Sequence, residues 1–319
     1  MKLVRGTKAW QACTGRGEAP GPGTAVTIGN FDGAHVGHAH IFAQLRAAAR
    51  QHELASVVLS FEPLPQQHFW RENAPLRLQG LRNRVESISA SGIDYLMLLA
   101  FNDALAQLTP DQFIEDILVN TLQVKHLIVG DDFRFGRDRA GNVDTLRAAG
   151  RAAEQADHFT VVDTTTVDID GARVSSTRVR QALANNEIEE VATLLGRPYR
   201  IDGRVIHGEK LGRQLGFPTA NVALKKLVPP LAGVFAVFAT DLDTGKRYPA
   251  VANLGHRPTI GGRRLLLEVH LLNENRELYG HHLAIDFMHF IRGERRFDSL
   301  DELKAQIASD STAARTLLT

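Results

Sequence analysis

Cysteine, long apolar runs and an excess of charge of one sign are all scarce in this chain of 319 residues. Cys13 is the only cysteine, which excludes an internal disulfide and a zinc site built on cysteines. No apolar run approaches the ~18 residues that a membrane-spanning helix needs. Lys8 and Gln11 interrupt the start of the chain, after Met1–Arg5, before the apolar core of a signal peptide develops. We therefore expect a cytoplasmic protein, whose thiol stays reduced.

Positive and negative side chains almost balance. Lys and Arg total 37 and Asp and Glu total 36, which gives a formal net charge of +1. This balance offers no electrostatic basis for nucleic acid or a membrane surface as the main partner. Hydrophobic residues make up 44% and charged residues 23% of the chain, which excludes a largely disordered protein. The length predicts two domains, and the sequence leaves a weak homo-oligomer open.

The first part of the chain alternates short apolar runs with stretches of helical spacing. Strands are predicted at 25–28, 56–61, 95–99, 126–129 and 159–162, and helices at 41–49, 81–88 and 143–153, with a further helix start at Thr109–Gln112. This alternation predicts a Rossmann-like α/β domain with a parallel sheet covered by helices. Ligands bind such sheets beyond the carboxyl ends of the strands, where Gly29 and Gly130 lie.

The pattern changes after Leu195. The segment Gly196–Pro198 breaks the last helix of the first part. Short strands separated by Gly, Pro and Asn are predicted at 199–205, 234–240, 248–253, 265–271 and 283–290. They indicate a small antiparallel barrel or a sandwich. A capping box at Ser299–Glu302 opens a closing helix that we expect to run through Ile307. We therefore predict one domain at 1–195 and a second at 196–319.

The densest motif is the segment Thr27–His38, TIGNFDGAHVGH, where a strand gives way to a helix. Its glycines permit tight turns, and the N-terminus of the helix attracts phosphate. His35 and His38 are three residues apart, so one helical turn puts both on one face. There they can donate hydrogen bonds to charge that develops in phosphoryl transfer. Histidines that only cap or pack are the structural alternative. A zinc site that adds His40 fits less well, because nothing supplies its loop geometry.

A second glycine-rich segment, residues 203–221, lacks the Walker A pattern. Backbone amides of such a loop can still cradle phosphates, and Thr219 and Asn221 offer neutral oxygens that suit Mg²⁺. Further on, Glu268 stands in an apolar run, where a carboxylate needs a partner or faces a site. The structural alternatives are a plain barrel hairpin and an outward-facing carboxylate with His270 on the same face.

These segments together resemble the bacterial bifunctional riboflavin kinase/FMN adenylyltransferases. The adenylyltransferase module of that family resembles TIGNFDGAHVGH (27–38), SFEPLP (60–65), VGDDFRFG (129–136) and VSSTRVR (174–180). The riboflavin kinase module resembles GEKLGRQLGFPTAN (208–221), GVFAV (233–237), VANLGHRPT (251–259) and EVHLL (268–272). The two signatures are unrelated, occur in the family's order and span nearly the whole chain. Leu64 departs from the pattern, since the family commonly has His there.

The resemblance implies roles for particular residues. In the adenylyltransferase module, the catalytic residues are His35, His38 and Arg180, the ATP-binding residues are Gly29, Asn30, Ser176 and Thr177, and the flavin-side residues are Phe61, Asp132 and Phe133. In the kinase module, Glu268 is the catalytic base, Thr219 and Asn221 hold Mg²⁺, Gly208, Gly212 and Arg213 hold phosphates, and Arg292 lies near the flavin. From the residues alone, Phe133 also fits core packing, Ser175–Thr177 a plain N-cap, and Asp132 a solvated turn.

The resemblance therefore implies an enzyme that uses riboflavin, FMN and ATP as substrates and Mg²⁺ as cofactor. One alternative is a flavin- or nucleotide-binding regulatory protein whose catalysis has decayed. Another is an N-terminal transferase with a different acceptor, joined to a barrel that serves as an interaction module. Thr219, Asn221 and Glu268 argue against the second alternative, because a binding barrel needs none of them.

Overall fold

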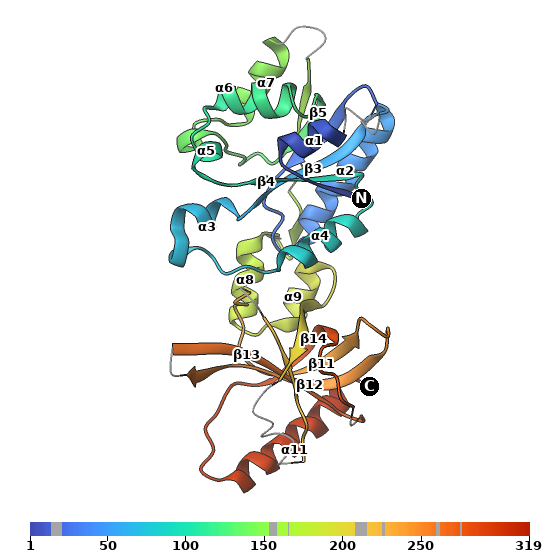
Figure 1. Cartoon of the computed structure of the whole chain (residues 1–319), viewed down its shortest axis with the longest axis vertical. Coiled ribbons are helices and arrows are strands. Elements are labelled where there is room, and N and C mark those ends of the chain that lie inside the picture. Colours follow the sequence, from blue (N-terminus) through green and yellow to red (C-terminus); the bar gives the residue numbers. More distant parts are fainter. Residues whose placement is uncertain are drawn as a thin grey trace. The chain divides into compact units, whose positions relative to one another are not determined.

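The chain forms two compact units in a computed structural model, which describes residues 1–13, 21–152, 158–164, 166–207, 216–224, 227–259, 262–274 and 276–319 (Figure 1). The first unit comprises Met1–Pro75 and Arg84–Val174, and the second comprises Leu76–Asn83 and Ser175–Thr319. No helix among these residues is both long enough and apolar enough to cross a membrane. Each unit is built around its own sheet, and the two are described separately below.

A six-stranded sheet forms the centre of the first unit. Its strands are β1 (Lys2–Arg5), β2 (Thr24–Ile28), β3 (Ala55–Glu62), β4 (Tyr95–Ala100), β5 (Val124–Val129) and β6 (Thr160–Asp163). All neighbours are parallel, in the order β1-β4-β3-β2-β5-β6. β2 is buried along its whole length, as expected of a central strand with both faces covered. The predicted parallel sheet is confirmed.

Helices and short turns connect these strands. They are α1 (Thr7–Cys13), α2 (Val36–Gln51), α3 (Pro65–Trp70), α4 (Leu81–Ala90), α5 (Asp103–Ala106), α6 (Pro110–Gln112) and α7 (Val143–Ala152), with a hairpin of β7 (Asp168–Ile169) and β8 (Ala172–Arg173). The helix start at Thr109 is confirmed, because its hydroxyl accepts the backbone N–H of Gln112. The turn continues as a π-helical segment, Phe113–Val119, which packs into the core.

The order of the strands reverses beside β2. β3 and β4 follow on one side of it, whereas β5 and β6 lie on the other. At such a switch point the loops after the two neighbouring strands diverge and leave a crevice at their carboxyl ends. The loops that begin at Gly29 and Gly130 follow β2 and β5. The topology therefore brings two of the predicted ligand-binding loops to one edge of the sheet.

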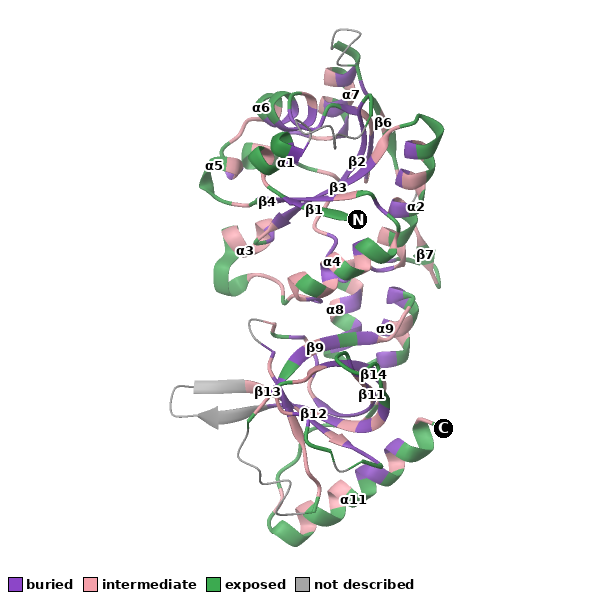
Figure 2. Ribbon diagram, turned by 45° about the vertical axis from the view of Figure 1, so that its right-hand side comes forward, coloured by how far each residue is buried: buried purple, intermediate pink, exposed green. Residues whose placement is uncertain are grey.

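A closed six-stranded antiparallel barrel forms the centre of the second unit. Its strands, in the order β10-β13-β12-β11-β14-β9, are β9 (Tyr199–Ile206), β10 (Ala220–Val222), β11 (Gly233–Asp241), β12 (Arg247–Thr259), β13 (Gly262–Leu271) and β14 (His282–Arg292). β9 alternates buried and more exposed positions (Figure 2), so that every second residue fills the barrel. Of the two predicted all-β forms, the barrel is confirmed.

Among the described residues of this unit, three helices accompany the barrel. They are α8 (Ser176–Ala184), α9 (Ile188–Leu195) and α11 (Leu300–Leu317). Gly196 ends α9 in the left-handed conformation, with φ 70°, as the predicted break requires. Ser299 caps α11 as predicted, but the expected end at Ile307 is wrong. The helix continues because Asp310 is buried and pairs with Arg292 of β14. β1, α1 and the three-residue β10 were not predicted from the sequence.

Candidate functional site

The loop after β2 is tightly bent around the ring of Phe31. Phe31 has a positive φ of 50°, and Gly33 and Ala34 follow with 87° and 42°, a region that bulky residues seldom adopt. The Phe31 ring is buried and lies over Gly29, where a Cβ atom would approach it to 2.8 Å. The packing of Phe31 therefore offsets the backbone strain and fixes the shape of the loop.

His35 and His38 lie together where this loop enters α2. His35 is the N-cap, and its Nδ1 accepts the backbone N–H of His38 at 3.3 Å. The two imidazole rings stack with their centroids 3.6 Å apart and their planes at 17°, so the prediction that they share one face is confirmed. Because Nδ1 of His35 accepts a hydrogen bond, the neutral ring carries its proton on Nε2. Nε2 is then a hydrogen-bond donor.

The start of α2 has the properties of an anion site. The helix has 16 residues, and its dipole and first N–H groups favour negative charge at this end. Gly37 sits close beside His35, since a Cβ atom there would lie 3.2 Å from the imidazole. The carbonyl of Asn30, in the preceding loop, accepts a hydrogen bond from the Ser60 hydroxyl. Stacked imidazoles at a helix N-terminus can stabilise charge on a phosphoryl oxygen.

The predicted flavin-side residues lie at the ends of β3 and β5. Phe61 is buried and meets Phe101 edge to face, with ring centroids 5.7 Å apart. Phe133 stacks on Phe135 and packs against the core of the unit. The carboxylate of Asp132 is exposed and lies 3.4 Å from the guanidinium of Arg173. Phe133 thus contributes to packing, and a flavin contact of these residues stays a prediction.

The residues of the predicted second ATP motif belong to the second unit. Ser175 caps α8, because its hydroxyl accepts a backbone N–H of the first turn at 3.2 Å. Ser176 and Thr177 follow in that turn. Nε of Arg180 donates to the carbonyl of Leu76 at 2.6 Å. Ser175 is therefore the structural cap, and phosphate binding by Ser176, Thr177 and Arg180 stays a prediction.

Three polar side chains form a row across neighbouring strands of the barrel. The register pairs Glu268 of β13 with Asn221 of β10 on one side and with Asn253 of β12 on the other. Residues directly opposite each other share a face of the sheet. Leu267 and Val269, which flank Glu268, are fully buried inside the barrel, so Glu268 lies on its outer face. The sequence did not indicate that Asn253 belongs to this row, because its position opposite Glu268 depends on the register of the strands.

Thr219 lies in the segment that leads into β10. It lines a small pocket together with Val269 and Tyr279. His270 stabilises the segment that contains Thr219, because its Nδ1 donates to the carbonyl of Pro218 at 2.9 Å. The predicted phosphate-binding residues Gly208, Gly212 and Arg213 lie outside the described residues. Thr219, Asn221 and Glu268 each carry an oxygen atom of the kind that ligates Mg²⁺, and Asn221 lies directly opposite Glu268.

Arg292 ends β14 and is held by α11. Its Nε and Nη2 donate to the two carboxylate oxygens of Asp310 at 3.0 and 2.7 Å. Asp310 is buried and also accepts a hydrogen bond from Gln306 at 2.8 Å. A bidentate pair of this kind fixes both the position and the plane of the guanidinium. The flavin-side role of Arg292 stays a prediction.

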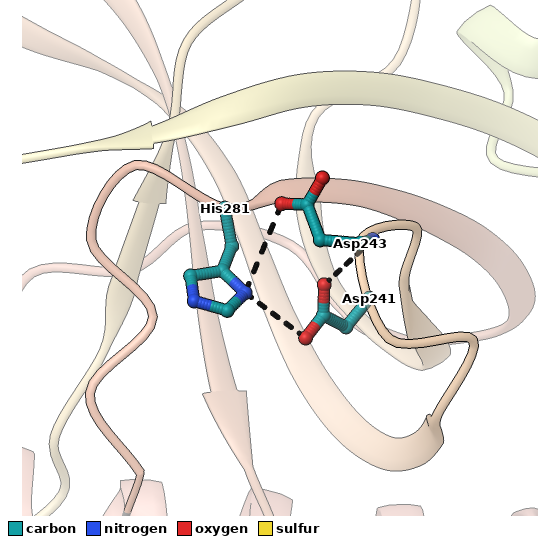
Figure 3. Close-up of side chains that lie close together, drawn as sticks. All are labelled: Asp241, Asp243 and His281. Carbon is teal, nitrogen blue, oxygen red and sulfur yellow. Dashed lines mark hydrogen bonds and ion pairs between the residues drawn. The ribbon is translucent and has the colours of Figure 1, made fainter.

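A further cluster joins the turn after β11 to the residue before β14 (Figure 3). Ligand atoms of Asp241, Asp243 and His281 lie within 4.8 Å of one another. Both carboxylate oxygens of Asp241 already accept hydrogen bonds, from the backbone N–H of Asp243, the Thr244 hydroxyl and Nδ1 of His281. Burial alone would raise the pKa of Asp241, but these hydrogen bonds outweigh it and lower the pKa. The cluster is therefore a hydrogen-bonded brace of the barrel.

This brace predicts a pH-dependent contribution to stability. The pKa of Asp241 is lower in the folded than in the unfolded chain, so its stabilisation is present above the unfolded value of about 3.9 and is lost as the pH falls through the folded pKa. We expect Asp241→Asn to lower the free energy of unfolding by about 1–3 kcal/mol at pH 7. Urea unfolding at pH 7 and pH 3 measures the difference. Asp111→Asn, at an exposed site in α6, is the control. An Asp241→Asn loss that is equal at both pH values contradicts the prediction.

Family models match the chain in two segments. A FAD synthetase model matches residues 18–178, and a riboflavin kinase model matches residues 195–318. Together they define a protein with two flavin-related enzyme modules in one chain. The similar curated proteins carry both names. That of Escherichia coli strain K12 is 45% identical over 315 residues, which cover 99% of this chain and 97% of the relative.

The corresponding protein of Pseudomonas fluorescens is 48% identical over 296 residues, covering 92% of this chain and 93% of the relative. Both are bifunctional riboflavin kinase/FMN adenylyltransferases, and the chain belongs to this family. A crystal structure titled as a macrolide-efflux protein from Streptococcus pneumoniae is also similar, with a TM-score of 0.83, 27% identity and 99% coverage of both chains. The efflux activity is stated for that protein, and the likeness concerns the fold.

Proposed function

We propose that the chain catalyses two consecutive reactions, phosphorylation of riboflavin to FMN by ATP, and transfer of an adenylyl group from a second ATP to FMN. Residues 196–319 form the kinase domain in this proposal, and residues 1–195 form the adenylyltransferase domain. One observation carries it, namely that each unit has its own polar cluster suited to ATP chemistry. The first has the stacked His35 and His38 at a helix start, and the second has Glu268 opposite Asn221.

In the kinase reaction, Glu268 accepts the proton of the ribityl 5′-hydroxyl of riboflavin. The hydroxyl oxygen attacks the γ-phosphorus of ATP, and ADP leaves. The position of Glu268 supports this role, because its carboxylate is half-buried on the outer face of the barrel, beside an amide and near the segment of Thr219. Gly208, Gly212 and Arg213 bind phosphates in this proposal, and Arg292 contributes on the flavin side.

The oxygen donors of the barrel fit Mg²⁺. Thr219 supplies a hydroxyl and Asn221 an amide oxygen, with the Glu268 carboxylate on the neighbouring strand. Mg²⁺ takes oxygen ligands and usually shares its coordination between a few protein groups and substrate phosphates. We therefore propose Thr219 and Asn221 as its ligands. When bound, Mg²⁺ neutralises part of the charge of the ATP phosphates.

In the adenylyl transfer, a phosphate oxygen of FMN attacks the α-phosphorus of ATP. The bond from that phosphorus to the bridging oxygen breaks, so that FAD forms and pyrophosphate leaves. No protein nucleophile is needed, because the FMN phosphate already is one. His35, His38 and Arg180 stabilise the charge on the α-phosphate. The ATP-binding residues are Gly29, Asn30, Ser176 and Thr177, and the flavin-side residues are Phe61, Asp132 and Phe133.

The proposed substrates also suit the compartment expected from the single cysteine, since a cytoplasmic enzyme has both ATP and reduced thiols available. The proposal assigns riboflavin, FMN and ATP as the partners of the protein.

An end-point assay tests the proposal. Purified protein is incubated with riboflavin, excess ATP and Mg²⁺, and the flavins are separated by chromatography. We expect FMN to appear first and FAD afterwards. FMN alone contradicts the adenylyltransferase assignment, and conversion of added FMN without any use of riboflavin contradicts the kinase assignment. Neither product, from folded protein that still binds flavin, favours a regulatory flavin-binding protein.

A further inference from the structure

Arg84 of α4 is an arginine in an unusual place. Its side chain is only 2% exposed, although arginine is almost never fully buried unless its charge is paired. Removing a guanidinium from water is costly unless hydrogen bonds replace its hydration. Neither the reactions proposed above nor the motifs of the sequence give Arg84 a role.

The guanidinium of Arg84 connects the ends of two neighbouring strands. Nη1 donates to the carbonyl of Asn30, just beyond β2, at 3.1 Å. Nη2 donates to the carbonyl of Phe61, near the end of β3, at 2.9 Å and to Oε2 of Glu62 at 2.8 Å. The carboxylate of Glu62 is partly exposed, so it pairs with Arg84 while it retains contact with water. One side chain thereby contacts the loop after β2, the end of β3 and a counter-charge.

The two carbonyls belong to segments with different proposed tasks. Asn30 precedes Phe31, whose positive φ of 50° begins the strained turn toward His35. Phe61 belongs to the segment proposed for the flavin side. A hydrogen bond to the Asn30 carbonyl restrains the peptide group that Asn30 shares with Phe31, and thus the direction in which the strained turn leaves the sheet.

We propose that Arg84 is a positioning residue for adenylyl transfer. It fixes the spacing between the loop of Asn30, on the ATP side, and the end of β3, on the flavin side. It contacts only protein groups in this role and acts through them. The inference rests on the adenylyl transfer proposed above. Its physical basis is that a displacement of about 1 Å between reacting groups can lower a rate about 10²-fold.

The test compares Arg84→Met with Arg46→Met in the full-length protein. Arg46 lies in the same unit and donates from Nη1 to the carbonyl of Ser91, just beyond α4, at 2.9 Å. Arg46→Met therefore also loses a hydrogen bond from an arginine to a backbone carbonyl, but at a place away from Asn30 and the end of β3. We expect Arg84→Met to lower kcat for FAD formation from FMN about 10²-fold, with KM for ATP changed less than kcat. Arg46→Met keeps the wild-type kcat, and both variants keep riboflavin kinase activity.

Two further measurements separate positioning from a loss of stability. Arg84→Lys keeps a positive charge and three N–H donors, so it folds more readily than the methionine variant and is expected to recover a large part of kcat. Hydrogen exchange of the amides in residues 29–38 is expected to be faster in Arg84→Met than in Arg46→Met. A folded Arg84→Met protein with wild-type kcat, or equal exchange in the two variants, overturns the inference.

The same experiment distinguishes an error in the proposed adenylyl transfer from an error in the role of Arg84. In that case the wild-type protein itself forms no FAD from FMN and ATP, and the inference falls together with the function on which it rests. If the wild type forms FAD and folded Arg84→Met forms it at the same rate, only the inference about Arg84 is overturned. Where the methionine variant does not fold, Arg84→Gln, which has no charge and cannot reach all three acceptors, takes its place in this comparison.

Discussion

Replacing Glu268 with glutamine is expected to lower kcat for FMN formation about 10²- to 10⁴-fold, the usual contribution of a general base. Glutamine has nearly the shape of glutamate but cannot accept the hydroxyl proton. The outer-face row with Asn221 and Asn253 stays intact, since an amide replaces a carboxylate of the same length. The rate of FMN formation from riboflavin and ATP measures the effect.

Two comparisons make this result specific. FAD formation from added FMN is expected to continue in Glu268→Gln, because the stacked histidines belong to the other unit. Glu189→Gln changes a carboxylate of α9 that contacts His289, and it is expected to leave FMN formation unchanged. If folded Glu268→Gln forms FMN at the wild-type rate, Glu268 is not the base. If it loses both activities, the division into two sites is wrong.

Replacing His38 with alanine is expected to lower kcat for FAD formation about 10²- to 10³-fold, as removal of one charge-stabilising donor does elsewhere. The substitution keeps the cap of α2, because that hydrogen bond uses the backbone N–H of His38. It removes one of the two stacked rings, so His35 also loses its neighbour. FAD formation from FMN and ATP is the measurement, and FMN formation from riboflavin is expected to stay at the wild-type rate.

His40→Ala is the matched control for this prediction. His40 is exposed on the same helix and contacts Gln44, so its removal is expected to leave both activities unchanged. An equal loss of FAD formation in the two variants contradicts a specific role for His38. Such a result, accompanied by loss of bound zinc, instead supports the metal alternative that combines His35, His38 and His40.

The sequence was sufficient for features that lie within one segment. The stacked pair is predictable because His35 and His38 share a helical turn. The parallel sheet is predictable because short apolar runs alternate along the chain with stretches of helical spacing. The ends of helices and strands were harder to predict from the sequence. β1 is a four-residue strand with only Val4 buried, and α11 extends past a polar stretch because Asp310 pairs with Arg292.

Features that depend on distant segments could not be predicted. Arg84 stands in an ordinary helical sequence, and its burial follows from where α4 meets β2 and β3. Asn253 lies in the motif VANLGHRPT (251–259), but only the register of β12 and β13 places it opposite Glu268. Local patterns indicate which chemistry a segment can perform, whereas partners that are far apart in the sequence are determined by tertiary structure.

The edge position of β1 has a consequence for self-association and recombinant handling. β1 pairs along its full length with β4, whose interior residues Leu96–Leu99 are buried. Removal of the first six residues turns β4 into an edge strand with an unpaired backbone and apolar side chains, which is a template for intermolecular strand pairing. Trimming this end of the chain is therefore expected to cause aggregation while every proposed site residue remains in place.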